Sequence, residues 1–203
     1  NRVNPRATPA VGDIDGDGNL EIIALSMNGG LIAFRKDGSR LWVSTRADGI
    51  TPYLGKYNSG TVALADMDND GKVEIVVGGT VFNEKGVLTN DGMIGREHWG
   101  ENAFGYGAVS IIADVDGNAA TTEQYVVTGN RAMRKDGSLL WDQSVASDAG
   151  AALSDGYPAI ADLDNDGVPE LVVTAQGKIR VQNAITGALI EQIALPNQPT
   201  KAV

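Results

Sequence analysis

The chain has 203 residues, a net charge of −10 and an apolar content of 42%. That length is enough for a sizeable core. The acidic balance argues against nucleic acid as a partner, because binding to phosphates needs a basic surface. No run of ~18 apolar residues marks a segment that inserts into a membrane. The chain has no cysteine, so disulfides say nothing about its compartment.

Four related acidic stretches recur along the chain. Their first residues are Asp13, Asp66, Asp114 and Asp162, at spacings of 53, 48 and 48 residues. Three of them follow the pattern D-x-D-x-D-G-x-x-E without a gap, and these three hold twelve of the 26 acidic residues. Short β-branched runs flank them, which indicates that each stretch joins two strands. An EF-hand would instead place helices on both sides and a Glu at position 12.

The four stretches are called acidic loops 1 to 4 below, in chain order. Each of the three complete loops, 1, 2 and 4, is predicted to bind one Ca²⁺ ion. Carboxylates at positions 1, 3, 5 and 9, a carbonyl at position 7 and a Gly at position 6 for the bend supply hard oxygen ligands. The predicted ligands are Asp13, Asp15, Asp17, Asn19 and Glu21 in loop 1, Asp66, Asp68, Asp70, Lys72 and Glu74 in loop 2, and Asp162, Asp164, Asp166, Val168 and Glu170 in loop 4, with Asn19, Lys72 and Val168 acting through their carbonyls. Because protein fills every ligand position, the ions are expected to be structural and to couple metal binding to folding.

Acidic loop 3 departs from this pattern. It keeps Asp114, Asp116 and Asn118 as candidate ligands. If the next strand starts at Tyr125, two residues are inserted and Gln124 stands where the other loops have Glu. The sequence leaves two outcomes open for this loop, a weaker fourth Ca²⁺ site or no site.

Repeats of about 50 residues with four short strands each are typical of β-propeller blades. In the first repeat, strands are predicted at about 8–12, 20–26, 31–35 and 40–44. Almost no helix is expected, because helical periodicity is absent. The predicted fold is therefore an all-β β-propeller with four blade-like repeats, either an arc of a larger propeller or a small closed ring.

The whole chain, residues 1–203, is predicted to form one domain or segment. The repeats are expected at about 7–56, 57–106, 107–154 and 155–195, and residues 196–203 are expected to form a linker or to start a next blade.

The repeats resemble the FG-GAP and VCBS repeats of integrin-like β-propellers, in which an acidic Ca²⁺ loop joins the two inner strands of a blade. The matching residues are the three D-x-D-x-D-G-x-x-E loops, residues 104–108 ahead of the third loop and residues 76–79 after the second. The Asp-Gly-Ser-x-Leu-Trp hairpins are also similar to the outer strands of quinoprotein-type propeller repeats. The resemblance covers residues 7–195. It implies a propeller that serves as an adhesin, receptor, lectin or polysaccharide lyase, without choosing among them.

The end of the blades opposite the acidic loops is the predicted ligand face. We call it the link end, because it carries the links between repeats at about 45–60, 90–107 and 142–157. The candidate ligand contacts there are Tyr53, Tyr57, His98, Trp99, Phe104, Tyr106 and Tyr157. Such residues can hold a sugar or a peptide, and the aromatic ones can alternatively pack between blades as core. Trp42 and Trp141 are expected to pack between blades.

Three functional hypotheses remain open. The first is a non-catalytic, Ca²⁺-stabilised recognition or adhesion module that binds a protein or glycan at the link end, with further propeller blades in a longer protein. The second is a lyase-like enzyme acting on polysaccharides, for which Arg46, Arg96 and His98 are the basic candidates. The third is an architectural spacer. The expected setting is extracellular, cell-surface or periplasmic, since loops of this kind fill where free Ca²⁺ is near millimolar. Direct membrane insertion is not expected.

Overall fold

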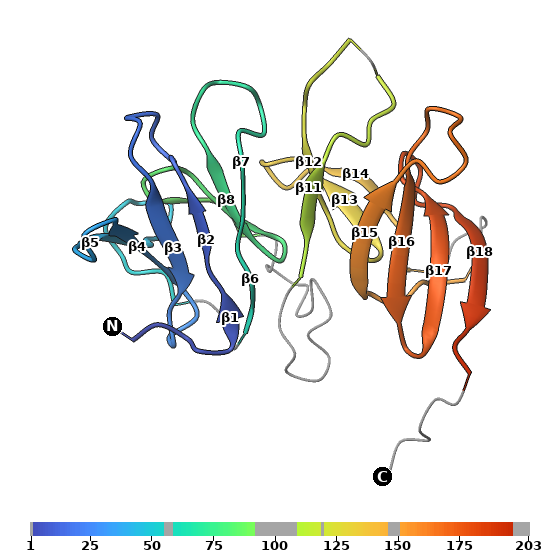
Figure 1. The fold of residues 1–203 in the computed structure, drawn as a ribbon, viewed down its shortest axis with the longest axis horizontal. Coiled ribbons are helices and arrows are strands. Elements are labelled where there is room, and N and C mark those ends of the chain that lie inside the picture. The colour runs from blue at the N-terminus through green and yellow to red at the C-terminus, as the bar shows by residue number, and fades with distance from the viewer. Residues whose placement is uncertain (1, 55–58, 92–108, 119, 146–150, 197–203) are drawn as a thin grey trace.

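The computed structural model describes residues 2–54, 59–91, 109–118, 120–145 and 151–196. These residues are all-β and contain no helix. They form four antiparallel sheets of four strands, together with one short parallel pair of strands (Figure 1). The predicted fold class and its four-stranded repeats are confirmed. In the part of the chain just defined, no helix has the length and hydropathy of a membrane span.

Each sheet consists of four consecutive strands in chain order, and each is called a blade below. Blade 1 contains β2 (Ala10–Gly12), β3 (Glu21–Leu25), β4 (Leu31–Arg35) and β5 (Arg40–Val43). Blade 2 contains β7 (Ala63–Ala65), β8 (Glu74–Val77), β9 (Thr80–Phe82) and β10 (Leu88–Asp91). Blade 3 contains β11 (Ile111–Ala113), β12 (Tyr125–Val127), β13 (Arg131–Met133) and β14 (Leu139–Asp142). Blade 4 contains β15 (Tyr157–Ala161), β16 (Glu170–Ala175), β17 (Lys178–Asn183) and β18 (Leu189–Ala194).

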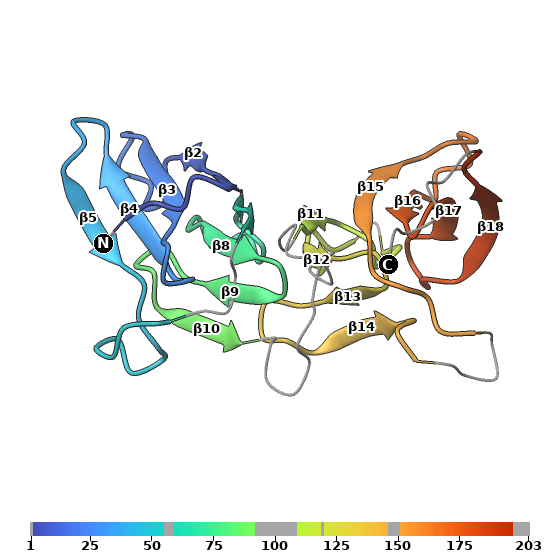
Figure 2. The same ribbon diagram turned by 90° about the horizontal axis from the view of Figure 1, so that it is seen from below.

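The sheets fan around a common centre and leave one side open (Figure 2). The first strand of each blade lies nearest this centre, where β7 contacts β2 and β11, and β11 contacts β15. The short strands β1 (Ala7–Thr8) and β6 (Gly60–Thr61) pair in parallel and join the entries of blades 1 and 2. The described blades therefore form an arc of a propeller.

The strand boundaries follow from the residues. In blade 1 the observed strands match the predicted ranges, except that β2 begins at Ala10. Pro9 separates it from β1, because proline has no N–H to donate to a ladder. In all four blades the pairing of the third and fourth strands shifts register once. Such irregularities increase the local twist.

The core lies along the second strands and between the blades. All four residues of β8 are buried, which explains why its apolar residues form a continuous run rather than an alternation. One cluster of buried side chains joins blades 1 and 2 and reaches into blade 3, and a second joins blades 3 and 4.

Two tryptophans join neighbouring blades by the same contact. Trp42 donates its indole N–H to the Glu84 carbonyl at 3.2 Å, and its ring lies so close to Gly86 that a Cβ there would come within 2.6 Å. Trp141 likewise donates to the Ala184 carbonyl at 2.9 Å and covers Gly187. The predicted packing role of both tryptophans is confirmed.

Candidate metal centres

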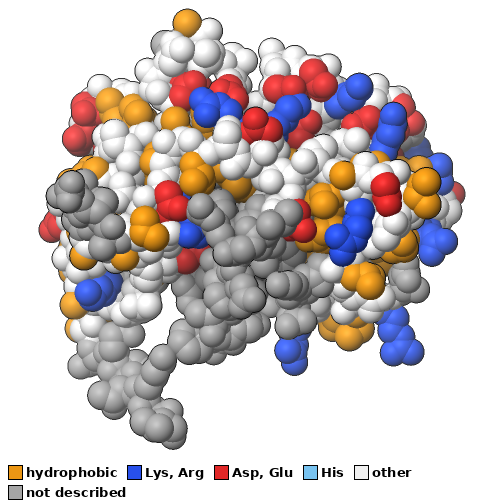
Figure 3. Space-filling view, turned by 180° about the vertical axis from the view of Figure 1, so that it is seen from behind, with side chains coloured by type: hydrophobic (Ala, Val, Ile, Leu, Met, Phe, Trp, Pro, Cys, Tyr) orange, Lys and Arg blue, Asp and Glu red, His pale blue; other side chains and the backbone are white. Residues whose placement is uncertain are grey.

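The four acidic loops lie at one end of the arc, the upper edge in Figure 1, and each joins the first and second strands of a blade. Seen from behind, carboxylate side chains gather along this edge and alternate with Lys and Arg side chains (Figure 3). In each of three clusters, carboxylate oxygens lie within 4.8 Å of one another. The clusters are Asp13, Asp15 and Asp17 in loop 1, Asp66, Asp68 and Asp70 in loop 2, and Asp162, Asp164 and Glu170 in loop 4.

Backbone N–H groups orient the carboxylates in the same way in the three complete loops. The aspartate at position 1 accepts a hydrogen bond from the glycine N–H at position 6, at 2.8–3.0 Å. The aspartate at position 5 accepts one from the N–H of position 7, at 2.7–2.8 Å. These bonds fix the side-chain rotamers, which brings the remaining oxygens together.

Two loop positions require a left-handed backbone. Position 6 is Gly in all three complete loops, with φ of 84–87°. Position 4 also has a positive φ, and Gly16, Asn69 and Asn165 occupy it. Gly adopts this conformation without strain, and Asn tolerates it better than most residues. The sequence pattern predicted the bend at position 6 but missed the one at position 4.

The glutamate at position 9 is buried at the base of each complete loop. Glu21, Glu74 and Glu170 each accept a hydrogen bond from the N–H at loop position 2, at 3.4, 2.9 and 2.8 Å. Burial raises the pKa of Glu21 and of Glu74 above the ordinary value. A cation beside them would oppose this by favouring the charged form.

The hard-oxygen donor set fits a divalent cation, and lysine side chains already approach two of the loops. The Lys135 ammonium bonds the Asp68 carboxylate and lies 3.5 Å from Glu74 Oε1. In loop 1, Lys36 Nζ donates to Asn19 Oδ1 at 3.0 Å. Clustered carboxylates attract positive charge, and each of these contacts places a lysine ammonium beside an acidic loop.

The loops also link neighbouring blades. The carbonyl of Ile14 accepts a hydrogen bond from Val73 in the next loop at 3.3 Å, and the carbonyl of Met67 accepts one from Gln124 at 3.0 Å. The side chains of Ile14 and Met67, which stand at loop position 2, are buried. The corresponding Leu163 in the last blade of the arc is 55% exposed.

Loop 3 differs from the others in register. In loops 1, 2 and 4 the residue before the first Asp pairs with the glutamate, as in Ala65 with Glu74. In blade 3 the corresponding Ala113 pairs with Tyr125. The expectation that Gln124 replaces the glutamate is therefore wrong by one residue. Tyr125 takes the place of the glutamate, and the loop is three residues longer than the others.

Protein side chains fill the interior of loop 3. Tyr125 donates its hydroxyl to Glu123 Oε2 at 2.8 Å. The Arg134 guanidinium lies 3.1 Å from Glu123 Oε1 and 5.3 Å from the centre of the Tyr125 ring. Asp116 accepts a hydrogen bond from the Thr121 hydroxyl at 2.7 Å, and this bond is the main cause that lowers the Asp116 pKa. An arginine thus supplies positive charge beside the acidic groups of this loop.

Most of the predicted ligand contacts at the link end lie outside the described residues. These are Tyr57, His98, Trp99, Phe104 and Tyr106, and Arg96 of the lyase hypothesis lies there too.

The two candidate ligand contacts that the structure describes have different environments. Tyr53 is 5% exposed and packs edge-on against Phe82, with ring centroids 5.1 Å apart, so its proposed ligand contact is corrected to a packing role. Burial, together with the Asp91 carboxylate, raises the pKa of Tyr53 to about 12. Tyr157 begins β15 at the link end and is 40% exposed.

Residues 13–77 match the model of the FG-GAP-like repeat, which confirms the resemblance for this stretch. The matched stretch runs from the first aspartate of loop 1 to the end of β8, so it contains two complete acidic loops. No curated protein sequence matches the chain.

Several solved structures share the fold. The V. cholerae biofilm matrix protein Bap1 superposes with a TM-score of 0.70 at 22% identity, over 95% of this chain and 29% of Bap1. BBS1N, solved in complex with ARL6DN, superposes with a TM-score of 0.57 at 11% identity, over 98% of this chain and 59% of the BBS1N chain. Rhamnogalacturonan lyase YesW superposes with a TM-score of 0.50 at 20% identity, over 92% of this chain and 42% of the YesW chain. The chain thus spans less than two thirds of each of these proteins.

Proposed function

We propose that the chain is a Ca²⁺-stabilised recognition module whose acidic loops hold structural ions and whose link end contacts a protein or glycan ligand. One observation carries the metal part of the proposal. Three loops with the same residue pattern show the same set of backbone hydrogen bonds to their carboxylates, and each gathers carboxylate oxygens within 4.8 Å of one another.

The donor set favours Ca²⁺ over other ions. Carboxylates and a backbone carbonyl are hard ligands, and the loop offers more of them than Mg²⁺ uses from protein. In loop 2 the ligands would be Asp66, Asp68, Asp70 and Glu74, with the carbonyl of Lys72. A bound ion would neutralise the repulsion between these carboxylates and tie the first strand of the blade to the second.

The proposed role is structural rather than catalytic. The ligand carboxylates are held by the backbone of their own loop, and the loops join one blade to the next. Millimolar free Ca²⁺ would keep sites of this class filled, so we propose an extracellular, cell-surface or periplasmic setting.

Chelation tests the calcium part of the proposal. If Ca²⁺ is present at about tenfold above each dissociation constant, three sites add about 4 kcal/mol to the free energy of unfolding. For a chain of this size, removal by EGTA is expected to lower Tm by roughly 8–16 °C. Added Ca²⁺ should restore the original Tm and Mg²⁺ should not. An unchanged Tm in EGTA would contradict structural Ca²⁺.

Enzyme assays separate recognition from lyase chemistry. The purified chain, saturated with Ca²⁺, is incubated with pectin-like oligosaccharides, and unsaturated products are followed by their ultraviolet absorbance. The proposal expects no turnover. Turnover that is lost in His98→Ala would instead support the lyase hypothesis. A module that binds neither glycan nor protein would favour the architectural spacer.

A further inference from the structure

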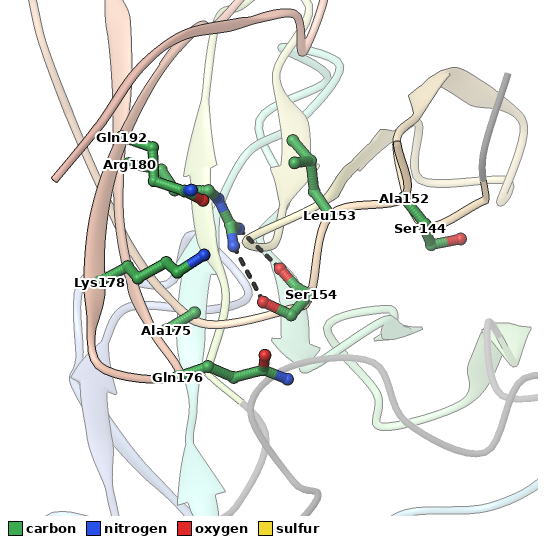
Figure 4. Close-up of a pocket in the computed structure, with 9 residues that line it drawn as sticks. All are labelled: Ser144, Ala152, Leu153, Ser154, Ala175, Gln176, Lys178, Arg180 and Gln192. Atoms are coloured by element: carbon green, nitrogen blue, oxygen red, sulfur yellow. Dashed lines mark hydrogen bonds between the residues drawn. The ribbon is translucent and has the colours of Figure 1, made fainter. Parts of the chain in front are cut away.

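A cleft of about 390 Å³ lies at the link end between blades 3 and 4 (Figure 4). The turn after β16, the start of β17, Gln192 of β18 and part of the link that enters blade 4 line it. This volume is at the small end of the range for pockets that bind small molecules, about 300–1,000 Å³. It suits one or two sugar rings better than a folded partner.

The charge of the cleft is opposite to that of the chain as a whole. Its lining includes Lys178 and Arg180 but no Asp or Glu. Arg180 is 2% exposed, and its guanidinium donates to the Ser154 hydroxyl at 3.0 Å and to the Ser154 carbonyl at 2.6 Å. It also donates to the carbonyl of Gly129 at 2.9 Å. Its Nε–H donates to Gln182 Oε1 at 3.2 Å, and the Asp155 carboxylate, next in the chain to Ser154, accepts from the Gly129 N–H at 2.8 Å. These contacts fix the guanidinium as part of the cleft wall.

Lys178 supplies a second positive charge, at an exposed position. Its ammonium and the Arg180 guanidinium both point towards Ser154 (Figure 4). Within the described ranges, no carboxylate forms an ion pair with Lys178, whereas Lys135 is engaged by Asp68 and Glu74. The amides of Gln176 and Gln192 add neutral donors and acceptors around these charges.

The turn at the edge of the cleft has an unusual backbone. Gln176 has φ of 46°, and it is the only residue with a positive φ in the described part of the chain that is neither Gly nor Asn. The same turn position in blade 2 is Gly78, with φ of 56°. A glutamine there costs conformational energy that a glycine avoids. Gln176 and Gly177 both have the positive φ of a two-residue hairpin turn, and Gln176 lines the cleft.

We propose that this cleft binds one acidic sugar unit, with its carboxylate facing Lys178 and Arg180 and its hydroxyls on the amides of Gln176 and Gln192. One exposed ammonium and one buried guanidinium already held by backbone, hydroxyl and amide acceptors suit a single carboxylate better than a phosphate dianion. The neutral amides and hydroxyls suit a polyhydroxylated ring better than an acidic peptide. The inference rests on the proposed recognition function of the link end.

Calorimetric titration of the Ca²⁺-saturated chain tests the proposal, with methyl galacturonoside as the probe and neutral methyl galactoside as the reference. The uronoside is expected to bind at least tenfold more tightly. Lys178→Gln, at an exposed position, should weaken uronoside binding tenfold or more. The matched control Lys85→Gln, which removes an exposed lysine of blade 2, should leave it unchanged.

Gln176→Gly separates ligand binding from stability. This variant should raise Tm by roughly 2–4 °C, because glycine relieves the positive φ, and it should weaken uronoside binding. A purely structural Gln176 would leave binding unchanged.

Equal affinity of Lys178→Gln and the unchanged chain would overturn the proposal. So would equal binding of inorganic phosphate or of a glutamate-containing peptide, since the cleft would then be a general anion site. Absence of uronoside binding with a normal response to EGTA would overturn this inference alone. Absence of the EGTA response would refute the calcium part of the proposed function and leave the cleft untouched.

Discussion

Acidic loop 3 and the three complete loops differ in how the charge of their carboxylates is balanced. Loops 1, 2 and 4 place a buried glutamate beneath clustered aspartates, and the lysines that approach them, such as Lys135 at Asp68 and Glu74, are fewer than the carboxylates. Loop 3 places Tyr125 at the register position of the glutamate and brings Arg134 to Glu123 at 3.1 Å. The three complete loops would thus need an external cation to balance their remaining carboxylates, whereas loop 3 pairs Glu123 with an arginine of its own hairpin.

The difference shows what the acidic loop does for a blade. Each loop must hold the first strand to the second while its side chains carry charge close to the core. Either a metal ion or an arginine can balance that charge. The two solutions should respond differently to chelation, substitution and pH, which makes the comparison testable.

The largest effect is expected from removing all three predicted metal sites. In the triple variant Asp15→Ala, Asp68→Ala and Asp164→Ala, each complete loop loses the carboxylate at position 3. In Ca²⁺ this variant should lose about 4 kcal/mol, and its Tm should fall roughly 8–16 °C to that of the unchanged chain in EGTA. A further fall of the variant in EGTA would show that Ca²⁺ still binds.

A single substitution in loop 4 compared with its counterpart in loop 3 sharpens the contrast. Asp164→Ala should lower Tm by about 3–6 °C in Ca²⁺ and have little effect in EGTA, since it removes one ion worth about 1.4 kcal/mol. Asp116→Ala should have a smaller effect that is the same with and without Ca²⁺, because Asp116 bonds Thr121. Equal, Ca²⁺-dependent effects of the two variants would mean that loop 3 binds metal.

Removing the internal cation tests loop 3 directly. Arg134→Gln should cost about 1 kcal/mol, because the ion pair with Glu123 is partly exposed and such pairs contribute little. Differential scanning calorimetry should show a Tm lower by roughly 2–4 °C in both Ca²⁺ and EGTA. Arg134→Lys, which keeps the charge, should recover part of the loss. Full rescue of Arg134→Gln by Ca²⁺ would contradict the assignment.

The smallest effect concerns pH. Burial raises the pKa of Glu21 and Glu74 above the ordinary value of 4.5 in the metal-free chain. Their protonated forms are therefore favoured in the folded state, and the metal-free chain should lose stability as pH rises through and above 4.5. The Asp116 pKa is lowered, so loop 3 should gain stability over the range in which Asp116 ionises. The Tm shift caused by Ca²⁺ should grow as the pH rises above 4.5, and a constant shift would contradict this account.

The acidic loops and the blades that they belong to could be predicted from the sequence. The spacing of Asp, Gly and Glu within the loops, with strand-forming runs on both sides, predicted strand-to-strand turns, and the repeat period predicted blades. Position 4 was missed, although Gly16, Asn69 and Asn165 share the tolerance for a left-handed backbone that would have indicated it.

Loop 3 and the link end depended on three-dimensional contacts. Gln124 and Tyr125 are adjacent, and only strand pairing shows which of them replaces the glutamate. Arg134 reaches loop 3 because the third strand of the blade ends beside the loop, a proximity that Arg35 and Lys36 in blade 1 also suggest. At the link end, attention to aromatic residues favoured Tyr53, which is buried, over the basic residues Lys178 and Arg180 that line the cleft.

The number of Ca²⁺ ions bound per chain tests the central claim most directly. Native mass spectrometry or equilibrium dialysis of the metal-free chain, titrated with Ca²⁺, should give three ions for the unchanged chain and two for Asp164→Ala, with Arg134→Gln still at three. Four ions in the unchanged chain would show that loop 3 is a metal site despite Arg134, and none would show that the acidic loops hold their shape without metal.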